Sequence, residues 1–226
     1  MYRIRNQIMA KTYSLTGDDI ASVPQLVANT YQESGKQVLV IGISGAPATG
    51  KSTLSESLLS GLSQLGFKAQ LCPMDGFHYP NSVLKEKGLT SVKGSIETFD
   101  VTSLAHLLSE AVTPNTDAFF WPKYCRELHD PIVEGFLIEP DTQIILLEGN
   151  YIYSTDEDWR PVSDLIDLKI FLTASEEVLR ERLISRHLAG GKSKQEALDK
   201  TERVDLVNAL KIKQYESNAD YVIQTH

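Results

Sequence analysis

The fold of this chain is most constrained by one stretch in which an apolar segment, a turn of small residues and a leucine-rich segment follow one another. Residues 38–41 are apolar and mostly β-branched, residues 45–52 read GAPATGKS, and leucines then recur at helical spacing up to Gly66. This is the pattern G-x-x-x-x-G-K-[ST] in the strand, turn and helix context that makes the motif specific. It predicts a loop that wraps around phosphate groups.

The chemistry expected of this loop follows from its residue types. Glycine at positions 45 and 50 lets the backbone turn tightly, so that successive N–H groups point at phosphate oxygens, and the next helix adds the positive end of its dipole. Lys51 is expected to reach the β and γ phosphates, and the Ser52 hydroxyl to bind Mg²⁺. The residues predicted to bind ATP are Gly45, Ala46, Pro47, Ala48, Thr49, Gly50, Lys51, Ser52 and Thr53.

Composition narrows the class of protein. The 226 residues suffice for one large α/β domain, and the net charge of −8 argues against nucleic acid as the main partner, because phosphate backbones need a basic face. Cys72 and Cys125 lie in no metal-binding spacing, which favours reduced thiols in a cytoplasmic protein. No secretory signal or membrane-spanning stretch is evident, so we expect no membrane association. The oligomeric state stays open, and an oligomer is possible.

Strand and helix patterns alternate along the rest of the chain. Their order favours a parallel, doubly wound α/β sheet, which binds ligands at the carboxyl ends of its strands. We expect one domain over residues 1–226, with residues 1–35 as an N-terminal helical extension, and see a long irregular region at 77–140. Further strands are predicted at 68–74, 143–147, 167–172 and 220–224, and helices at 18–35, 52–66, 101–112, 176–187 and 194–213.

Several helix ends carry recognisable signals. Ser22 and Pro24 suit the start of the first helix and Gly35 its end, while Asp100 suits a cap for the helix at 101–112. Residues 173–176, which read TASE, predict a capping box.

Two carboxylates stand at predicted strand ends. Glu148 follows four apolar residues, where a carboxylate facing the phosphate loop suits Mg²⁺, bound directly or through water, and Gly149 would let a ligand approach. Asp75 ends the strand at 68–74, so we predict that it accepts the hydroxyl proton of a phosphoryl acceptor. The alternative for Glu148 is a surface acid. The alternative for Asp75 is a purely structural role as the first residue of an Asp-Gly turn.

The helix at 176–187 carries Arg182 and Arg186 four residues apart and beside its apolar stripe. We expect a lid at about 174–192, whose closure excludes water and whose arginines neutralise charge on the transferring phosphoryl group. Packing of the arginine stems with ion pairs to neighbouring glutamates is the alternative, and the sequence does not decide between them. Gly190 and Gly191 suit a hinge or tip.

Aromatic, basic and imidazole groups alternate in residues 121–131, WPKYCRELHDP. This mixture suits a small polar acceptor, and the residues predicted to contact it are Asp75, His78, Tyr124, Arg126 and His129. A group of lysines at 85, 87 and 93 either receives an anionic acceptor or faces water.

From residue 37 onward the chain resembles the phosphoribulokinase, uridine kinase and pantothenate kinase superfamily. The resemblance rests on the motifs GAPATGKS, PMDGFHYPN, KGSIETFD, PKYCRELHDP, ILLEGNYIY and the helix ending in SRH. The chain most resembles the branch labelled as fructose-transport-system kinases or nucleoside-triphosphate-hydrolase-domain kinases. Cys125 stands where uridine kinases usually carry Asp, and Asp75-Gly76-Phe77 is closer to the pantothenate kinase pattern.

This resemblance implies a P-loop kinase fold with an α-helical lid, the cofactors ATP and Mg²⁺, and a small acceptor bearing a hydroxyl group. It also implies a proton-accepting role for Asp75, the strand-end acid at Glu148, and a lid position for Arg182 or Arg186. We therefore expect catalysis by Asp75, Lys51, Arg182 and Arg186, with Mg²⁺ at Ser52 and Glu148.

The predicted function is an ATP-dependent kinase acting on a sugar, a nucleoside or a pantothenate-like metabolite. The alternative is a nucleotide-binding regulator or ATPase without a phosphorylated product. Against a guanine-nucleotide switch, the sequence holds no Asn-Lys-x-Asp motif.

Overall fold

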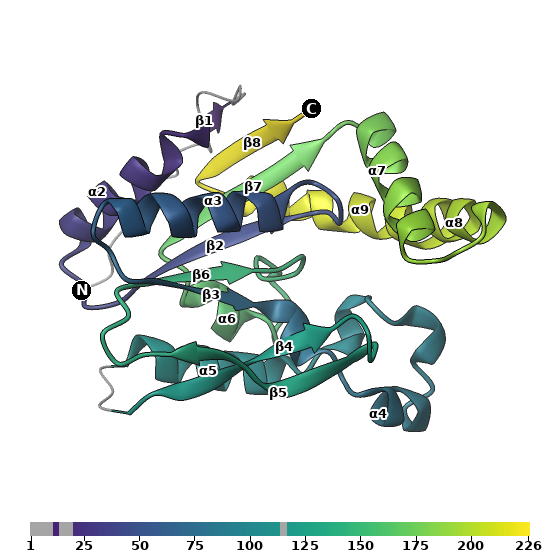
Figure 1. Ribbon diagram of the computed structural model, residues 1–226, viewed down its shortest axis with the longest axis horizontal. Coiled ribbons are helices and arrows are strands. Elements are labelled where there is room, and N and C mark those ends of the chain that lie inside the picture. Colours follow the sequence, from purple (N-terminus) through teal and green to yellow (C-terminus); the bar gives the residue numbers. More distant parts are fainter. Residues whose placement is uncertain (1–10, 14–19, 114–116) are drawn as a thin grey trace.

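The computed structural model describes residues 11–13, 20–113 and 117–226, and within them a six-stranded parallel sheet forms the centre of the molecule (Figure 1). The strand order β1-β8-β7-β2-β6-β3 confirms the predicted doubly wound α/β class. A separate antiparallel hairpin consists of β4 (Phe119–Cys125) and β5 (Asp130–Ile138). The sheet strands are β1 (Lys11–Tyr13), β2 (Leu39–Gly45), β3 (Ala69–Pro73), β6 (Ile144–Glu148), β7 (Leu168–Ala174) and β8 (Tyr221–Thr225).

Helices cover both faces of this sheet because its central strands are apolar on both sides. Along β2, Leu39 and Ile41 belong to one hydrophobic cluster and Val40 to the other, as expected when successive side chains alternate. The first cluster is closed by α2 (Val23–Ser34) and α3 (Lys51–Gln64), and the second by α5 (Val101–Val112), α6 (Arg160–Asp164) and α9 (Leu206–Lys213). None of the described helices is apolar and long enough to cross a membrane.

Several further elements connect the strands and the helices that cover them. Helices α7 (Glu176–Ala189) and α8 (Lys194–Lys200) project beside the carboxyl edge of the sheet and are joined to α9 by a π-helical turn, η4 (Thr201–Asp205) (Figure 1). The remaining short elements are α4 (Asn81–Glu86) and the 3₁₀ turns η1 (Met74–Phe77), η2 (Thr90–Val92), η3 (Ile96–Thr98) and η5 (Gln214–Asn218).

Most of the expected helix ends are confirmed. Ser22 is the N-cap of α2 and Gly35, with φ of 64°, ends it. The Asp100 carboxylate accepts a hydrogen bond of 3.0 Å from the backbone N–H of Ser103 and so caps α5. Residues 18 and 19 of the predicted first helix lie outside the described residues.

The capping box predicted at 173–176 is wrong. β7 continues to Ala174, which pairs with Thr225 of β8, so Thr173 belongs to the strand and cannot begin a helix. Ser175 is the N-cap of α7, and its hydroxyl accepts from the backbone N–H of Val178.

The N-terminal extension is not entirely helical, because Lys11–Tyr13 adds a parallel strand beside β8. The predicted helix at 194–213 is likewise divided by η4, whose π-helical bonding separates α8 from α9. The remaining residues of the extension, 1–10 and 14–19, lie outside the described residues.

The hairpin β4–β5 was not expected from the sequence. Its connection of four residues carries no Asn-Gly signal, and Pro122 sits at a shift in register between Trp121 and Lys123. Gly135 faces that shift, since a Cβ there would lie 2.6 Å from the carbonyl oxygen of Trp121. Much of the described part of the region at 77–140, which was predicted to be irregular, therefore forms helices and strands.

The ends of three neighbouring strands lie level with one another. Glu148 of β6 pairs with Ile43 of β2 on one side and with Pro73 of β3 on the other. The phosphate loop, Glu148 and the segment that carries Asp75 therefore leave the sheet at one edge.

Candidate active site

The loop after β2 has the strained backbone that its glycines suggested. Gly45 has φ of 149°, and a Cβ there would lie 2.3 Å from the carbonyl oxygen of Leu172 in β7. Gly50 has φ of 94° and immediately precedes α3, whose first turn has no side-chain cap. Ala48 also has a positive φ, of 66°, which is uncommon outside glycine. The uncapped turn leaves N–H groups and a helix dipole for an anion to stabilise.

Lys51 lies inside this loop. Its ammonium donates hydrogen bonds of 2.9 and 3.0 Å to the carbonyl oxygens of Gly45 and Ala46, and the residue is 8% exposed. Burial lowers the pKa of Lys51 to about 8, although the carboxylates of Glu148 and Asp75 act in the opposite direction. A bound anion would favour the charged form of this side chain.

Glu148 faces the start of α3. Its carboxylate accepts hydrogen bonds from Ser52 at 3.0 Å and from Ser55 at 3.4 Å. Burial raises the pKa of Glu148, while Lys51 and the two hydroxyl groups offset part of that effect. Ser55 was not expected at the site, although helical spacing places it one turn beyond Ser52.

The Ser52 and Glu148 pair suits Mg²⁺. Both groups supply the oxygen ligands that Mg²⁺ prefers, next to the loop that would hold phosphates. Within the described ranges no three His, Cys, Asp or Glu residues converge to form a metal site. Mg²⁺ usually takes its other ligands from water and from nucleotide phosphates.

Gly149, which was expected to let a ligand approach, lines the cavity and is also required by packing. A Cβ at Gly149 would lie 2.7 Å from the Met74 Cβ and 2.8 Å from a methyl group of Ile152. This glycine therefore allows the segment after β6 to pack against η1.

Asp75 lies in η1, directly after β3, and its side chain is exposed. The following Gly76 is required by packing, because a Cβ there would lie 2.1 Å from the carbonyl oxygen of Pro122 in β4. The indole N–H of Trp121 also donates to the carbonyl oxygen of Pro73 at 3.0 Å. The hairpin therefore fixes the turn that presents Asp75.

His78 stands against this turn. Its Nδ1 lies 2.9 Å from the backbone oxygen of Asp75, and its ring packs against Phe99 and Tyr124 with centroids 4.0 and 5.1 Å away. Burial lowers the pKa of His78, so the neutral imidazole is favoured. The predicted residues His78 and Tyr124 thus contact one another beside Asp75.

The tip of the hairpin is held by Lys93. The Lys93 ammonium donates to the backbone oxygen of His129 at 2.6 Å and to Oδ1 of Asn81 at 2.7 Å. Asn81 in turn donates its side-chain amide to the same oxygen of His129 at 3.0 Å. His129 has φ of 52°, and its backbone carbonyl oxygen accepts the hydrogen bonds from Lys93 and Asn81. Arg126, also on the connection, is exposed.

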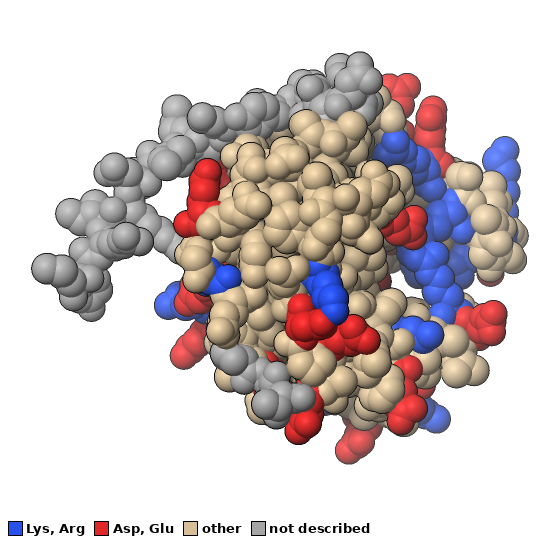
Figure 2. Space-filling model, turned by 60° about the vertical axis from the view of Figure 1, so that its left-hand side comes forward, with Lys and Arg blue, Asp and Glu red and all other residues tan. Residues whose placement is uncertain are grey.

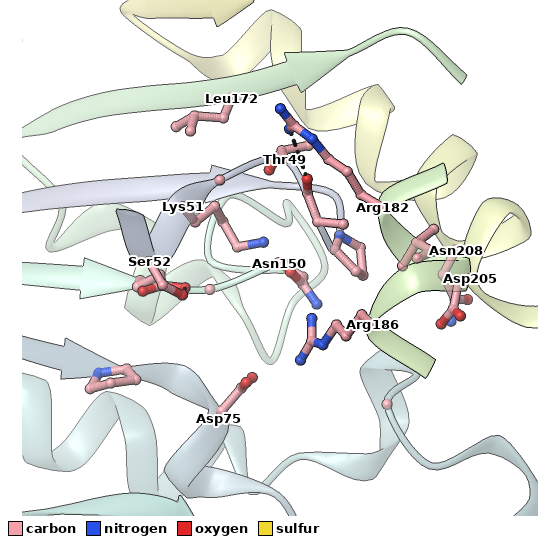
Figure 3. Close-up of a pocket in the computed structure, with 18 of the residues that line it drawn as sticks. Thr49, Lys51, Ser52, Asp75, Asn150, Leu172, Arg182, Arg186, Asp205 and Asn208 are labelled. Atoms are coloured by element: carbon pink, nitrogen blue, oxygen red, sulfur yellow. Dashed lines mark hydrogen bonds between the residues drawn. The ribbon is translucent and has the colours of Figure 1, made fainter. Parts of the chain in front are cut away.

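The two arginines of α7, Arg182 and Arg186, point in different directions (Figure 3). Arg182 donates to the backbone oxygens of Ala48 at 3.1 Å and His226 at 2.6 Å, and to the Thr225 hydroxyl at 3.2 Å. Arg186 instead extends toward Asn150 and the region of Asp75 (Figure 3). The structure therefore separates two residues that the sequence treated as equivalent.

The arginine helix also packs directly on the phosphate loop. Ala46 belongs to a small hydrophobic cluster with Leu179 and Leu183 of α7 and Leu206 of α9, against which Ala48 also packs. The small residues at these positions of the loop thus have a packing role in addition to the phosphate binding predicted for the loop.

One open cavity of about 1620 Å³ collects nearly all predicted site residues. The exceptions are Gly45 and Ala46, the first two residues of the loop, which do not line the cavity. We call the loop 45–53 with Glu148 the donor half. The acceptor half comprises Asp75, His78, Asn81, Lys93, Tyr124, Arg126 and His129.

The cavity is more positive than the chain as a whole, whose net charge is −8. Lys and Arg side chains gather along a hollow in the space-filling view (Figure 2). Among the described residues, four acidic residues line the cavity, namely Asp75, Glu127, Glu148 and Asp205, against seven basic ones, namely Lys51, Lys93, Arg126, Arg182, Arg186, Lys192 and Lys200. This contrast suits an anionic ligand.

Comparison with known proteins agrees with this geometry. Residues 40–226 match the phosphoribulokinase/uridine kinase family. The chain is 35% identical to the uncharacterised protein YggC of Escherichia coli over 82% of this chain and 77% of that protein. It is 30% identical to a “putative uridine kinase” of Schizosaccharomyces pombe, over 84% of each chain.

A solved structure agrees as well. The “putative fructose transport system kinase” from a Silicibacter species is 31% identical, with a TM-score of 0.83 over 92% of this chain and 99% of that chain. The chain therefore belongs to the phosphoribulokinase/uridine kinase family.

Proposed function

We propose that this chain transfers the γ-phosphoryl group of Mg·ATP to a hydroxyl group of a sugar, a nucleoside or a pantothenate-like metabolite. The family comprises ATP-dependent kinases that use Mg²⁺ and hydroxyl acceptors, so the chain is a phosphotransferase. The observation that supports the proposed roles is the single cavity shared by the phosphate loop, Asp75 and the hairpin. Such a cavity brings a nucleotide and a small acceptor together.

In the proposed reaction, the acceptor hydroxyl oxygen forms a bond to the γ phosphorus of ATP. The bond from that phosphorus to the bridging oxygen breaks, ADP leaves, and the hydroxyl proton passes to the Asp75 carboxylate. The product is a phosphate ester of the acceptor. Exposure of Asp75 at the cavity wall supports this role, because the acceptor needs direct access to the carboxylate.

The donor half supplies charge and orientation. Lys51 is proposed to exchange its bonds to the loop carbonyls for bonds to phosphate oxygens. Ser52 and Glu148 would hold Mg²⁺, which would supply positive charge to neutralise the phosphates. Ser55 would orient the Glu148 carboxylate.

We propose that residues 174–192 act as a lid on a single domain spanning residues 1–226. Closure over the cavity would exclude water and so limit hydrolysis of ATP. Arg186, which extends into the cavity, is proposed to contact the transferring phosphoryl group. Arg182 is proposed to position the loop, because it bonds to the strained residue Ala48.

Partner and location stay predictions. The predicted acceptor is a small molecule, and nucleic acid is not expected as a partner. The net charge of −8 and the basic side chains that line the cavity support this prediction. A cytoplasmic location rests on the sequence alone.

The direct test is a panel of hydroxyl-bearing metabolites with ATP and Mg²⁺, followed by ADP release and by mass spectrometry of the products. A kinase releases ADP in an acceptor-dependent way and yields a phosphorylated product. If the rate of ADP release does not change with any acceptor and no phosphorylated product forms, the protein would instead be an ATPase or a nucleotide-dependent regulator.

A further inference from the structure

Lys93 carries a positive charge that no carboxylate among the described residues pairs with. Its ammonium is hydrogen-bonded to two neutral oxygens, on His129 and Asn81. Within the described residues no carboxylate lies within ion-pair distance of it. Lys36, by comparison, is paired with Asp167.

The surroundings of Lys93 make this charge effective. The side chain is half-buried, and its ammonium lies 5.2 Å from the centroid of the Tyr124 ring. Two of its three N–H donors are used by His129 and Asn81, which leaves one donor for a ligand. A partly desolvated and preorganised cation attracts an anion more strongly than a flexible surface lysine does.

A second cation lines the same cavity. Arg126 lies on the hairpin connection that Lys93 holds, and no hydrogen bond or ion pair joins its guanidinium to another described residue. Glu127 also lines the cavity and is the opposing charge on that connection. Lys85 and Lys87, the other members of the lysine group noted in the sequence, do not line the cavity.

We propose that Lys93 and Arg126 form a subsite for an anionic group on the acceptor, a carboxylate or a phosphate, so that the enzyme phosphorylates hydroxy acids or sugar phosphates in preference to neutral alcohols. The preference among acceptors rests on the proposed kinase function, whereas the binding of an anion at this subsite does not. Lys93 acts here as a specificity residue, because it holds the part of the acceptor that does not react. Arg126 matches the geometry of carboxylates and phosphates, both of which can accept two parallel hydrogen bonds.

Binding can be tested without knowing the acceptor. The donor half is first saturated with Mg²⁺ and the β,γ-imido analogue of ATP, and inorganic phosphate is then added while the melting temperature is recorded. The wild type should show a further, saturable rise. Lys93→Met and Arg126→Gln should lose most of it, whereas the control Lys85→Met, an exposed lysine of α4, should keep it. Equal responses of the wild type and Lys93→Met would overturn the subsite.

Turnover with matched acceptor pairs then identifies the anion. Pantothenate is compared with pantothenol, which carries CH₂OH in place of the carboxylate, and fructose 6-phosphate with fructose. In one pair the anionic member should be preferred by at least about tenfold in kcat/KM, and Lys93→Met should remove that preference mainly by raising KM. Because Lys93 also bonds to the hairpin, Lys93→Arg should restore part of the preference, which a merely structural role does not predict.

The possible failures can be told apart. Phosphorylation of neutral acceptors that is as efficient in Lys93→Met as in the wild type would leave the kinase function standing and overturn the subsite. A phosphate response that depends on Lys93, without phosphorylation of any acceptor, would keep the anion subsite and reject the kinase reaction for this panel.

Discussion

The donor and acceptor halves of the cavity are built in different ways. The donor half is nearly continuous in sequence, since β2, the loop and the start of α3 follow one another, and only Glu148 comes from elsewhere. The acceptor half is assembled from η1, the segment before Gly94 and the β4–β5 hairpin. Its contacts, such as Lys93 to His129, join residues far apart in sequence. A contiguous site depends on local backbone geometry, whereas a site assembled from distant segments depends on packing between them.

The largest effect is expected from Asp75→Asn, which changes one atom in the acceptor half. If the carboxylate accepts the hydroxyl proton, turnover should fall by roughly 10² to 10⁴ because an amide cannot accept it. Acceptor-dependent ADP release measures the change. ATP at a hundred times its Kd should still stabilise the variant by about 2.7 kcal/mol, because the donor half is untouched. Turnover near the wild-type value in a folded variant would exclude Asp75 as the base.

The next effect separates the two arginines of α7. Arg186→Gln should lower kcat by about 10², the usual effect of losing one preorganised charge partner in the transition state. Arg182→Gln should instead weaken ATP binding, because its contacts are with Ala48 and the end of β8. Steady-state kinetics and nucleotide titration of both variants make the comparison. A lower kcat for Arg182→Gln together with weaker ATP binding by Arg186→Gln would assign the two roles the other way round.

Packing within the acceptor half, between η1 and β4, is tested by Gly76→Val. The added side chain has no room beside Pro122, so we expect destabilisation of about 1–3 kcal/mol and a displaced Asp75. Gly190→Ala is the matched control, since its Cβ would meet only ordinary contacts at 3.4 and 3.5 Å. Chemical denaturation measures stability, and acceptor-dependent turnover measures the displacement. A Gly76→Val variant as stable and active as the control would show that η1 and β4 move apart freely.

The smallest effect concerns the donor half alone and depends on pH. Because burial lowers the pKa of Lys51 to about 8, the free enzyme loses this charge above that pH, and ATP binding then requires uptake of a proton. Affinity for Mg·ATP should therefore fall about tenfold between pH 7 and pH 9. Lys51→Met should bind more weakly but with a flat profile over this range. An equal slope in both proteins would assign the pH dependence to another group.

The pKa of Lys51 also has a consequence for folding. Because its pKa is lowered in the folded state, the unfolded chain binds more protons between about pH 8 and pH 10.5. The contribution of Lys51 to stability is unfavourable below pH 8, and this penalty shrinks as pH rises through that window. Lys51→Met should accordingly be more stable than the wild type at neutral pH in the absence of nucleotide, and the advantage should decline in alkaline buffer.

The features that were predicted correctly from the sequence depend on residues that are close together along the chain. The loop at 45–52, the cap at Asp100 and the stop at Gly35 each follow from local backbone preferences, and they were predicted correctly. The hairpin was missed because its bent strand and four-residue connection carry no local turn signal. The contact between Gly76 and Pro122 and the position of Lys93 depend on chain segments that meet only in the folded protein. The capping box failed because pairing of β7 with β8 overrode a local signal.

The level ends of β2, β6 and β3 limit how this enzyme can change in evolution or by design. Side chains alternate between the faces of a strand, so deleting one residue within β6 would turn Glu148 to the opposite face, away from Ser52. Insertions beyond the strand ends, as in the connection of the hairpin, leave that pairing intact. New acceptor specificity should therefore arise through changes in the length of the segments beyond the strands, while the strands themselves keep a fixed number of residues.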